Sequence, residues 1–320
     1  MYELDKKDLR IMYELDLNAK QTIKQISKKV RLSPEVTNYR IKRLEDEKII
    51  LGYYTLINVY SLGYELYRVY LGLGTISEEK KKEFLDYLTK LRQVGQIAIT
   101  GGEYDLIVGI IEKDNISFNK LVEEILANFG SFIRKKEISV ITELSQYNKK
   151  FLNISEEKSG NHEFYFNPLK KNLKLDSIDY KLLYFLSNNA RKNSTEIEKE
   201  IKVTRKTVVN RINNLVKKGA IVGFRPVFNR ELLNLTYFRI LFKLQSERGD
   251  LANFLNYFKN NSLVTYSSKC MGSWELEIEL AVKSTKEAYD FVSEIKGKNN
   301  AIRDAVIIPV LQDLKYQFSF

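Results

Sequence analysis

The 320-residue sequence contains one cysteine, Cys270, and one histidine, His162. A single cysteine excludes an internal disulfide, and so few thiols and imidazoles exclude a Cys/His metal cluster. The sequence also lacks a Walker loop, zinc-ligand spacing and a nucleophile–histidine–acid arrangement. We therefore expect no enzyme activity, no cofactor and no metal, with Cys270 as a small buried apolar residue and His162 as a solvated one.

Long hydrophobic runs are absent as well. The longest core-like run, residues 305–311, is far shorter than the ~20 apolar residues that cross a bilayer. Residues 2–7 lack the apolar region of a signal peptide. With 44% hydrophobic and 29% charged residues the composition is ordinary for a soluble chain, and we expect a cytoplasmic protein.

Positive charge is in excess, and it is unevenly distributed. The formal net charge is +11, which indicates an anionic partner. Residues 1–58 hold 12 Lys and Arg against 9 Asp and Glu, whereas residues 172–230 hold 13 against 5. A generally lysine-rich surface is the simpler explanation, but it does not account for the clustering in the second segment.

A helix-turn-helix pattern covers residues 23–52. Ile23, Ile26 and Val30 recur at helical spacing, and Ser33 with Pro34 provides an N-cap and a proline at the first position of the next helix. The second helix carries donors and positive charge on its outward face, as required for entry into the DNA major groove. The extended residues 49–54 that follow fit the wing of a winged helix.

The same pattern occurs twice. With an offset of 171 residues, segment 175–223 aligns with segment 4–52 without a gap. Identical pairs include Asp8/Asp179, Arg40/Arg211 and Gly52/Gly223, and Thr204 takes the capping place of Ser33. The chain is therefore a tandem duplication.

Each helix-turn-helix is followed by alternating strands and helices in the order β-α-β-β-α-β, the ferredoxin-like arrangement. We expect an α+β protein with two winged helix-turn-helix domains and two ferredoxin-like domains, each with a bare apolar sheet face that needs a partner. The predicted boundaries are 1–60 and 61–147 for the first pair, 148–174 for a linker with one short strand at 162–166, and 175–230 and 231–320 for the second pair.

These features resemble the Lrp/AsnC (feast/famine) family of transcriptional regulators. The resemblance rests on Leu32-Ser33, Arg40-Ile41-Lys42-Arg43-Leu44-Glu45, Leu62-Gly63-Tyr64, Thr100-Gly101 and Glu103-Tyr104-Asp105. The second copy departs in its last turn, where one glycine remains and Glu275 replaces Asp105. The resemblance implies a DNA-binding regulator, responsive to an amino acid or another small effector, whose ferredoxin-like domains pair through their open faces. The two halves would then form a pseudo-dimer within one chain, and further homo-oligomerisation stays open.

The recognition helices supply the predicted contacts with double-stranded DNA. The predicted DNA-binding residues are Glu35, Asn38, Tyr39, Arg40, Lys42 and Arg43 in the first copy, and Lys202, Arg205, Lys206, Asn210, Arg211, Asn213 and Asn214 in the second. For Arg40 and Arg211, an intramolecular ion pair is the alternative to a phosphate contact. Because Glu35 repels phosphate where Lys206 attracts it, we expect the second copy to dominate affinity and the first to set register.

The resemblance places effector binding in one turn, formed by Thr100, Gly101, Gly102, Glu103, Tyr104 and Asp105. Backbone amides of the glycines would meet a carboxylate and Asp105 an ammonium group. The alternative is a glycine-rich turn that needs positive φ and binds nothing.

Two other functions stay open. Siroheme decarboxylases resemble this family and occur as two related halves, but they need histidine in the cavity between the ferredoxin-like domains, where this sequence has none. An architectural chromatin protein would bind DNA without sequence preference.

Overall fold

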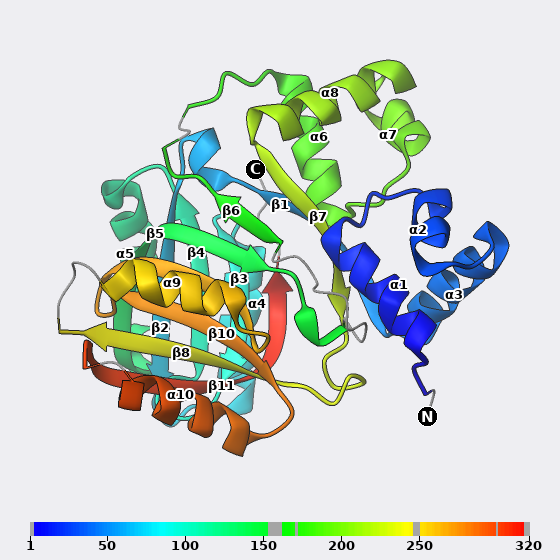
Figure 1. The fold of residues 1–320 in the computed structure, drawn as a ribbon. Coiled ribbons are helices and arrows are strands. Elements are labelled where there is room, and N and C mark those ends of the chain that lie inside the picture. The colour runs from blue at the N-terminus through cyan, green and yellow to red at the C-terminus, as the bar shows by residue number, and fades with distance from the viewer. Residues whose placement is uncertain (1–2, 153–161, 170–171, 246–249, 299, 317–320) are drawn as a thin grey trace.

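The computed structural model describes residues 3–152, 162–169, 172–245, 250–298 and 300–316. Two helical domains lie on one side of a β-barrel, which carries further helices on its outer surface (Figure 1). The α+β class with two winged helix-turn-helix and two ferredoxin-like domains is confirmed. In the described residues no helix is long and apolar enough to cross a membrane.

The first helical domain consists of α1 (Lys6–Leu17), α2 (Ile23–Val30) and α3 (Pro34–Asp46), followed by strand β1 (Ile50–Ile57). Asp5 and Thr22 cap α1 and α2 through capping boxes, and Ser33 accepts a hydrogen bond from the backbone N–H of Val36 at the start of α3. These local capping signals explain why the helices begin where the sequence predicts.

The second helical domain repeats this order with α6 (Ser177–Asn188), α7 (Ser194–Ile201), α8 (Arg205–Lys218) and strand β7 (Ile221–Phe228). The turn before each recognition helix has the same left-handed residue, with φ of 57° at Arg31 and 61° at Lys202. The equivalence extends to the caps, because Thr204 accepts a hydrogen bond from the N–H of Thr207 as Ser33 does from Val36. The duplication therefore holds at the level of backbone conformation.

The extended segment predicted as the wing is a strand, and its pairing partner lies in the other copy. β1 forms no hairpin within its own copy and instead pairs antiparallel with β7, from Ile50 opposite Phe228 to Ile57 opposite Ile221. This two-stranded ribbon joins the helical domains (Figure 1). An extended, β-prone segment predicts a strand but does not identify its partner, which here comes from the other repeat.

The first ferredoxin-like unit contains β2 (Glu65–Leu73), α4 (Glu78–Lys90), β3 (Val94–Thr100), β4 (Leu106–Glu112), α5 (Asn115–Phe129) and β5 (Ile133–Tyr147). The second contains β8 (Thr236–Leu244), α9 (Asp250–Asn260), β9 (Val264–Gly272), β10 (Leu276–Val282), α10 (Thr285–Lys298) and β11 (Ile302–Tyr316). Short 3₁₀ segments lie at Val59–Leu62, Gly130–Phe132 and Lys150–Leu152.

The two sheets join into one closed barrel. The strand order is β2-β4-β3-β11-β8-β10-β9-β5, and β5 also pairs with β2, which closes the ring. The seams between repeats are β3–β11 and β5–β9. Strand β6 (Glu163–Phe166), the short strand predicted between the halves, adds to the free end of β5, while residues 153–161 and 170–171 of the predicted linker lie outside the described residues.

Hydrophobic clusters fill the space between each sheet and its own helices, including Phe84 and Phe118 in the first unit and Phe258 and Phe291 in the second. The barrel interior is more polar than the expected bare apolar face. Tyr70 and Trp274 lie there with aliphatic side chains, and so do charged residues. The prediction of an apolar inner face was therefore only partly right, since period-two alternation shows which side chains face inward but not that charges will pair there.

The buried charges come from both repeats. Arg68 and its counterpart Arg239, at the same 171-residue offset, are each 3% exposed, and Glu277 lies between them at 0%. Arg239 Nη1 donates to Glu277 at 2.7 Å, and Arg68 Nε lies 3.7 Å from the same carboxylate. The acid comes from the second half alone, because the first half has Ile107 at the matching position. The acid nearest to Arg68 of the first half is therefore supplied by the second half.

Candidate nucleic-acid interface

The recognition helices present their predicted faces to solvent. In α3, Thr37, Ile41 and Leu44 are buried while Glu35, Asn38, Tyr39 and Lys42 are exposed, with Tyr39 at 64%. In α8, Val208, Ile212 and Leu215 are buried, and the exposed set is Arg205, Lys206, Asn210, Asn213 and Asn214. Lys202, in the preceding turn, is exposed too.

Arg40 and Arg211 form the intramolecular ion pairs that were left open as the alternative to a phosphate contact. Arg40 Nη1 donates to Asp5 at 2.7 Å and to Asp8 at 2.8 Å. Arg211 Nη1 makes the equivalent contacts with Asp176 at 2.6 Å and Asp179 at 3.0 Å. These ion pairs hold the recognition helix against the first helix of its domain, so the alternative of an intramolecular ion pair applies to both arginines.

Arg43 is partly buried and contacts both α1 and its own helix. Its Nη2 donates to Asp8 at 3.0 Å, and its guanidinium lies 5.9 Å from the centre of the Tyr39 ring. The corresponding position in the second copy is Asn214, which is exposed. The first recognition helix is thus more tightly tied to its own domain than the second.

The two recognition helices differ in charge at their N-termini. Glu35 is exposed, and hydrogen bonds from its own backbone amide and from the Ser33 side chain lower its pKa, so the carboxylate stays ionised. Lys206 is the matching residue of α8, with Arg205 before it. A negative group therefore faces solvent on one helix where a positive group does on the other.

The β1–β7 ribbon fixes the separation of these helices through paired contacts. Asn58 N–H donates to Ala220 at 2.9 Å, and Asn229 N–H donates to Ile49 at 2.9 Å. Ala19 N–H donates to Phe224 at 2.8 Å, as Ala190 N–H does to Tyr53 at 3.0 Å. Within each pair, the donor and acceptor of one bond match those of the other bond after a shift of 171 residues. The two helical domains are therefore arranged about an approximate two-fold axis.

Each domain also completes the hydrophobic core of the other. Ile57 of β1 packs with Leu182 and Leu215 of the second domain. Phe228 of β7 packs with Ile11 of the first. Because each core uses a strand from the other repeat, neither helical domain is an independent folding unit in this arrangement.

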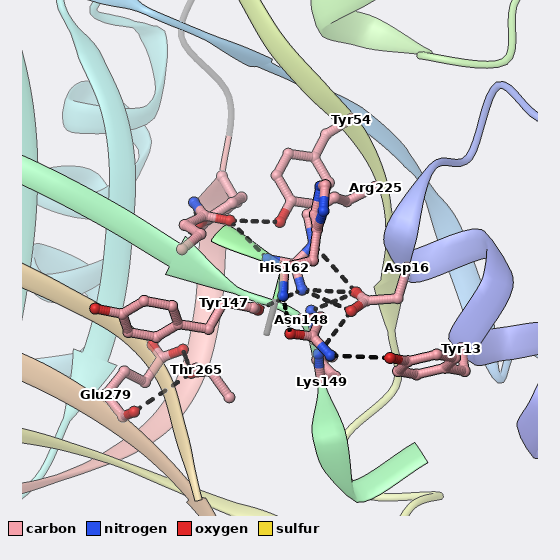
Figure 2. A network of polar contacts seen from close by, with 12 residues as sticks. Tyr13, Asp16, Tyr54, Tyr147, Asn148, Lys149, His162, Arg225, Thr265 and Glu279 are labelled. Carbon is pink, nitrogen blue, oxygen red and sulfur yellow. Dashed lines mark hydrogen bonds and ion pairs between the residues drawn. The ribbon is translucent and has the colours of Figure 1, made fainter. Parts of the chain in front are cut away.

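A buried charge network connects the helical domains to the barrel (Figure 2). Asp16 of α1 is fully buried and accepts two hydrogen bonds from Arg225 Nη2, at 2.7 and 2.9 Å, and one from Nε at 3.1 Å. Arg225 Nη1 donates to Gln146 of β5 at 3.0 Å. Lys149 donates to the same carboxylate from its backbone at 2.7 Å and from Nζ at 3.2 Å. Burial raises the pKa of Asp16, but Arg225 and Lys149 outweigh burial and lower it overall.

Neither Asp16 nor Arg225 was predicted as functional. Their counterparts in the other repeat are Ser187 and Tyr54, so the ion pair exists on one side only. The sequence contained a signal for this pair. At each of these two positions one repeat has a charged residue, Asp16 or Arg225, and the other repeat has a neutral one. The alignment of the copies does not show, however, that these positions touch.

The turn predicted to bind an effector is committed to the fold. Asp105 Oδ2 accepts a hydrogen bond from the N–H of Leu73 at 2.6 Å, and Glu275 Oε2 accepts one from Leu244 at 2.8 Å in the second copy. The Gly101 N–H donates to Pro309 of β11 at 3.0 Å. The Asp105 carboxylate and the Gly101 amide are therefore already hydrogen-bonded within the fold, and the exchange of Asp for Glu preserves the carboxylate contact.

The other residues of this turn have structural roles as well. Thr100 Oγ1 donates to the Tyr104 carbonyl at 2.7 Å, and Gly102 has φ of 84°. Glu103 pairs with Lys135 at the surface, and Tyr104 is buried in the barrel. These contacts are the ones expected of the alternative, a glycine turn that serves the fold.

Comparison with known proteins identifies both helix-turn-helix segments. A profile of winged helix-turn-helix DNA-binding domains matches residues 4–50 and 175–222. The HTH-type transcriptional regulator Ptr1 of Methanocaldococcus jannaschii is 35% identical over 121 residues, which are 38% of this chain and 80% of that protein. The leucine-responsive regulatory protein of Escherichia coli is 26% identical over 148 residues, 46% of this chain and 90% of that protein.

A solved structure resembles the whole chain. The siroheme decarboxylase NirDL aligns with a TM-score of 0.62 over 97% of this chain and 92% of that one, at 10% sequence identity. At this identity the likeness concerns the fold, including the arrangement of two repeats in one polypeptide.

Proposed function

Because this chain belongs to the Lrp/AsnC family of DNA-binding transcriptional regulators, we propose that its two internal repeats act as a pseudo-dimer that recognises a specific DNA sequence. The observation that carries the proposal is the pair of exposed recognition helices, α3 and α8, held about an approximate two-fold axis by β1 and β7. A symmetric dimer of helix-turn-helix domains binds two half-sites of a palindrome. One chain with two unequal helices would instead bind an asymmetric site in a single orientation.

The second helix is the stronger candidate for affinity. Arg205 and Lys206 begin α8, where cations attract DNA phosphates, and Asn210 and Asn213 are exposed amides suited to adenine edges. In α3 the exposed Glu35 opposes phosphate, while Asn38 and Lys42 supply donors. We propose that α8 provides most of the binding free energy and that α3 fixes register and orientation.

Selection of bound duplexes from a random pool, followed by fluorescence anisotropy over a range of salt, tests this proposal. The double variant Arg205→Gln/Lys206→Gln should weaken binding and flatten the slope of log K against log salt by about 0.9 for each lost phosphate contact. Lys82→Gln/Lys90→Gln on α4, also exposed, is the matched control with the same loss of charge. Unchanged binding by the first variant would refute the assignment.

Architectural DNA binding is the nearest alternative. Competition between the selected duplex and random duplex separates the two, since each mismatch in a recognised site costs about 1–3 kcal/mol and a non-specific binder shows no such preference. Equal competition would favour the architectural role.

An enzyme of the siroheme decarboxylase type is the second candidate, and the whole-chain likeness to NirDL favours it. The barrel has a cavity at its end, lined by Lys149, Arg225, Arg230 and Arg239 among others. The only histidine of the sequence, His162, is not among the residues lining this cavity. Titration with an iron tetrapyrrole, followed by its absorbance, tests this candidate, and no spectral change would remove it.

A further inference from the structure

An open groove of about 620 Å³ lies beside the second recognition helix, between the start of α6 and the C-terminal half of α8. Asn210 and Asn214 of α8 line it. Both are exposed and belong to the face of α8 that we assign to DNA, so the groove continues that face. Lys174 and Lys218 line the groove as well, and neither has a role in the function proposed above.

These two lysines supply the uncompensated positive charge of the groove. Lys174 lies shortly before α6 and is exposed, and Lys218 is the last residue of α8 and partly exposed. Arg211 also lines the groove, but its charge is shared by Asp176 at 2.6 Å and Asp179 at 3.0 Å. Within the described part of the chain neither lysine forms an ion pair. With three cations and two acids, the groove has a net charge of +1.

The same positions of the first domain carry the opposite charge. At the 171-residue offset, Glu3 takes the place of Lys174 and Glu47 takes that of Lys218, and both acids are exposed. Together with the ion-paired residues at the other positions, the equivalent surface of the first domain holds four acids and two cations, a net charge of −2. The two exposed positions therefore change sign while the ion pairs between the first helix and the recognition helix are kept.

Interaction with the helix dipole explains only half of this difference. Cations are favourable at the end of a helix and acids at its start, which suits Lys218 at the end of α8 and Glu3 before α1. The same rule disfavours Lys174 before α6 and Glu47, the C-cap of α3. Contact of the groove with an anion accounts for both lysines, and lack of such a contact in the first domain permits both acids.

We propose that this groove binds a phosphate of the DNA backbone, with Lys174 and Lys218 as cations and the side-chain amides of Asn210 and Asn214 as further donors. The inference deepens the proposed function, on which it rests. The first domain repels a phosphate at the equivalent place. The protein therefore holds the DNA backbone beside the recognition helix at one half-site only, which orients the duplex independently of its base sequence.

Fluorescence anisotropy with the selected duplex tests the groove. Lys174→Gln/Lys218→Gln should weaken binding by about eightfold at 0.1 M salt for each lost phosphate contact, and it should flatten the slope of log K against log salt by about 0.9 per contact. Lys82→Gln/Lys90→Gln on α4 is the control with the same loss of charge, and circular dichroism checks that both variants are folded. A groove variant that binds as this control does, with the same slope, would overturn the proposal.

Neutral phosphates locate the contact on the DNA. Methylphosphonate replaces one phosphate at a time along both strands of the selected duplex. We expect at least one position, at the edge of a single half-site, where the replacement weakens binding of the wild type but not of Lys174→Gln/Lys218→Gln. If every replacement weakens both proteins equally, the two lysines contact no phosphate and the inference fails.

A gain of binding that misfolding cannot imitate comes from the first domain. Glu3→Lys/Glu47→Lys gives this domain the charges of the second, so it should bind DNA more tightly and acquire a sensitive phosphate at the other half-site. Glu79→Lys/Glu83→Lys on α4 makes the same change of net charge away from both recognition helices and should acquire none. Absence of a new sensitive phosphate in the first variant would overturn the assignment of this surface to the backbone.

Sedimentation velocity without DNA examines another acidic partner, the first-domain surface of a second chain. Self-association of the wild type that Lys174→Gln/Lys218→Gln abolishes would show that a protein occupies the groove, and it would overturn the DNA assignment. A wild-type chain that binds no duplex refutes the proposed function and the groove with it. A chain that binds its selected duplex equally well without the two lysines refutes the groove alone.

Discussion

Asp16 on α1 and Arg225 on β7, 209 residues apart in sequence, form a buried ion pair with contacts at 2.7, 2.9 and 3.1 Å. The pair joins the first helical domain to a strand of the second repeat, and Gln146 and Lys149 extend it to the barrel. Because the other side of the approximate two-fold axis has Ser187 and Tyr54, this connection is asymmetric. The helical domains are therefore not held to the barrel in the same way.

Removing the Asp16 carboxylate should lower the free energy of unfolding. Asp16→Asn leaves Arg225 and Lys149 buried without a counter-charge, and loss of one partner of a buried ion pair typically costs about 3–5 kcal/mol. Urea unfolding followed by circular dichroism measures the change. Asp46→Asn, an exposed acid on α3, is the control and should change stability little. A variant at position 16 that is as stable as this control would contradict the role of the network.

The contribution of Lys149 to the free energy of unfolding should change with pH in the alkaline range. Its pKa in the folded chain is about 8 against an ordinary 10.5, with burial as the main cause and Arg225 as the second. Between these values the unfolded chain holds a proton that the folded chain has lost, so the contribution to stability rises with pH across this window. The melting temperature of the wild type minus that of Lys149→Met should therefore increase from pH 8 to pH 10.5. A difference that stays flat or falls would show that Lys149 is charged throughout.

The buried charges of the barrel interior should also contribute to stability. Glu277 is the shared acid of Arg239, at 2.7 Å, and Arg68, at 3.7 Å, and it also accepts a hydrogen bond from Tyr70 at 2.9 Å. Glu277→Gln removes the acid that Arg68 shares with Arg239 and leaves Arg239 with Glu279, at 3.0 Å, as its remaining ion pair. We expect a loss of about 3–5 kcal/mol in the free energy of unfolding, because Arg68 stays buried beside a neutral side chain. Glu294→Gln on the surface of α10 is the matched control. Equal stability of the two variants would mean that the arginines are neutralised in another way.

Sequence patterns predicted the helices and strands well because their signals are local. Ser33 and Thr204 cap the recognition helices as expected, and the 171-residue offset reappears in backbone hydrogen bonds such as Asn58 to Ala220 and Asn229 to Ile49. What the patterns did not reveal is pairing over long range. The exchange of β1 and β7, and the barrel seams β3–β11 and β5–β9, depend on partners that no local pattern specifies.

For the candidate site as well, the sequence predicted which side chains are exposed but not which distant groups they pair with. Exposure of Asn38 and Asn210 follows from helical periodicity, and both are exposed. Asp105 has the residue type of an ammonium ligand, but its carboxylate accepts a hydrogen bond from Leu73, which residue type alone does not reveal. The corresponding bond of Glu275 shows that the two repeats keep a contact where their residues differ.

The reassignment of Arg211 is testable against a neighbour on the same helix. Arg211→Gln removes ion pairs with Asp176 and Asp179, so it should lower the melting temperature modestly while leaving the salt dependence of DNA binding nearly unchanged. Lys206→Gln should do the opposite, with little effect on melting and a slope of log K against log salt reduced by about 0.9. Thermal unfolding and anisotropy on both variants separate the roles. A reduced slope for Arg211→Gln would show that Arg211 contacts a DNA phosphate.

Reversing the charge on the first recognition helix gives the most direct test of unequal contributions. Glu35 is exposed and ionised at the start of α3, and Lys206 is its counterpart in α8. Glu35→Lys replaces a repulsion from phosphate with an attraction, so DNA affinity should rise and the salt slope should steepen by about 0.9. The gain should apply to selected and random duplexes alike, because a phosphate contact carries no sequence information. Glu83→Lys on the outer surface of α4 makes the same change of net charge away from both recognition helices. If that control raises affinity as much as Glu35→Lys does, the effect belongs to overall charge, and α3 does not approach the DNA as proposed.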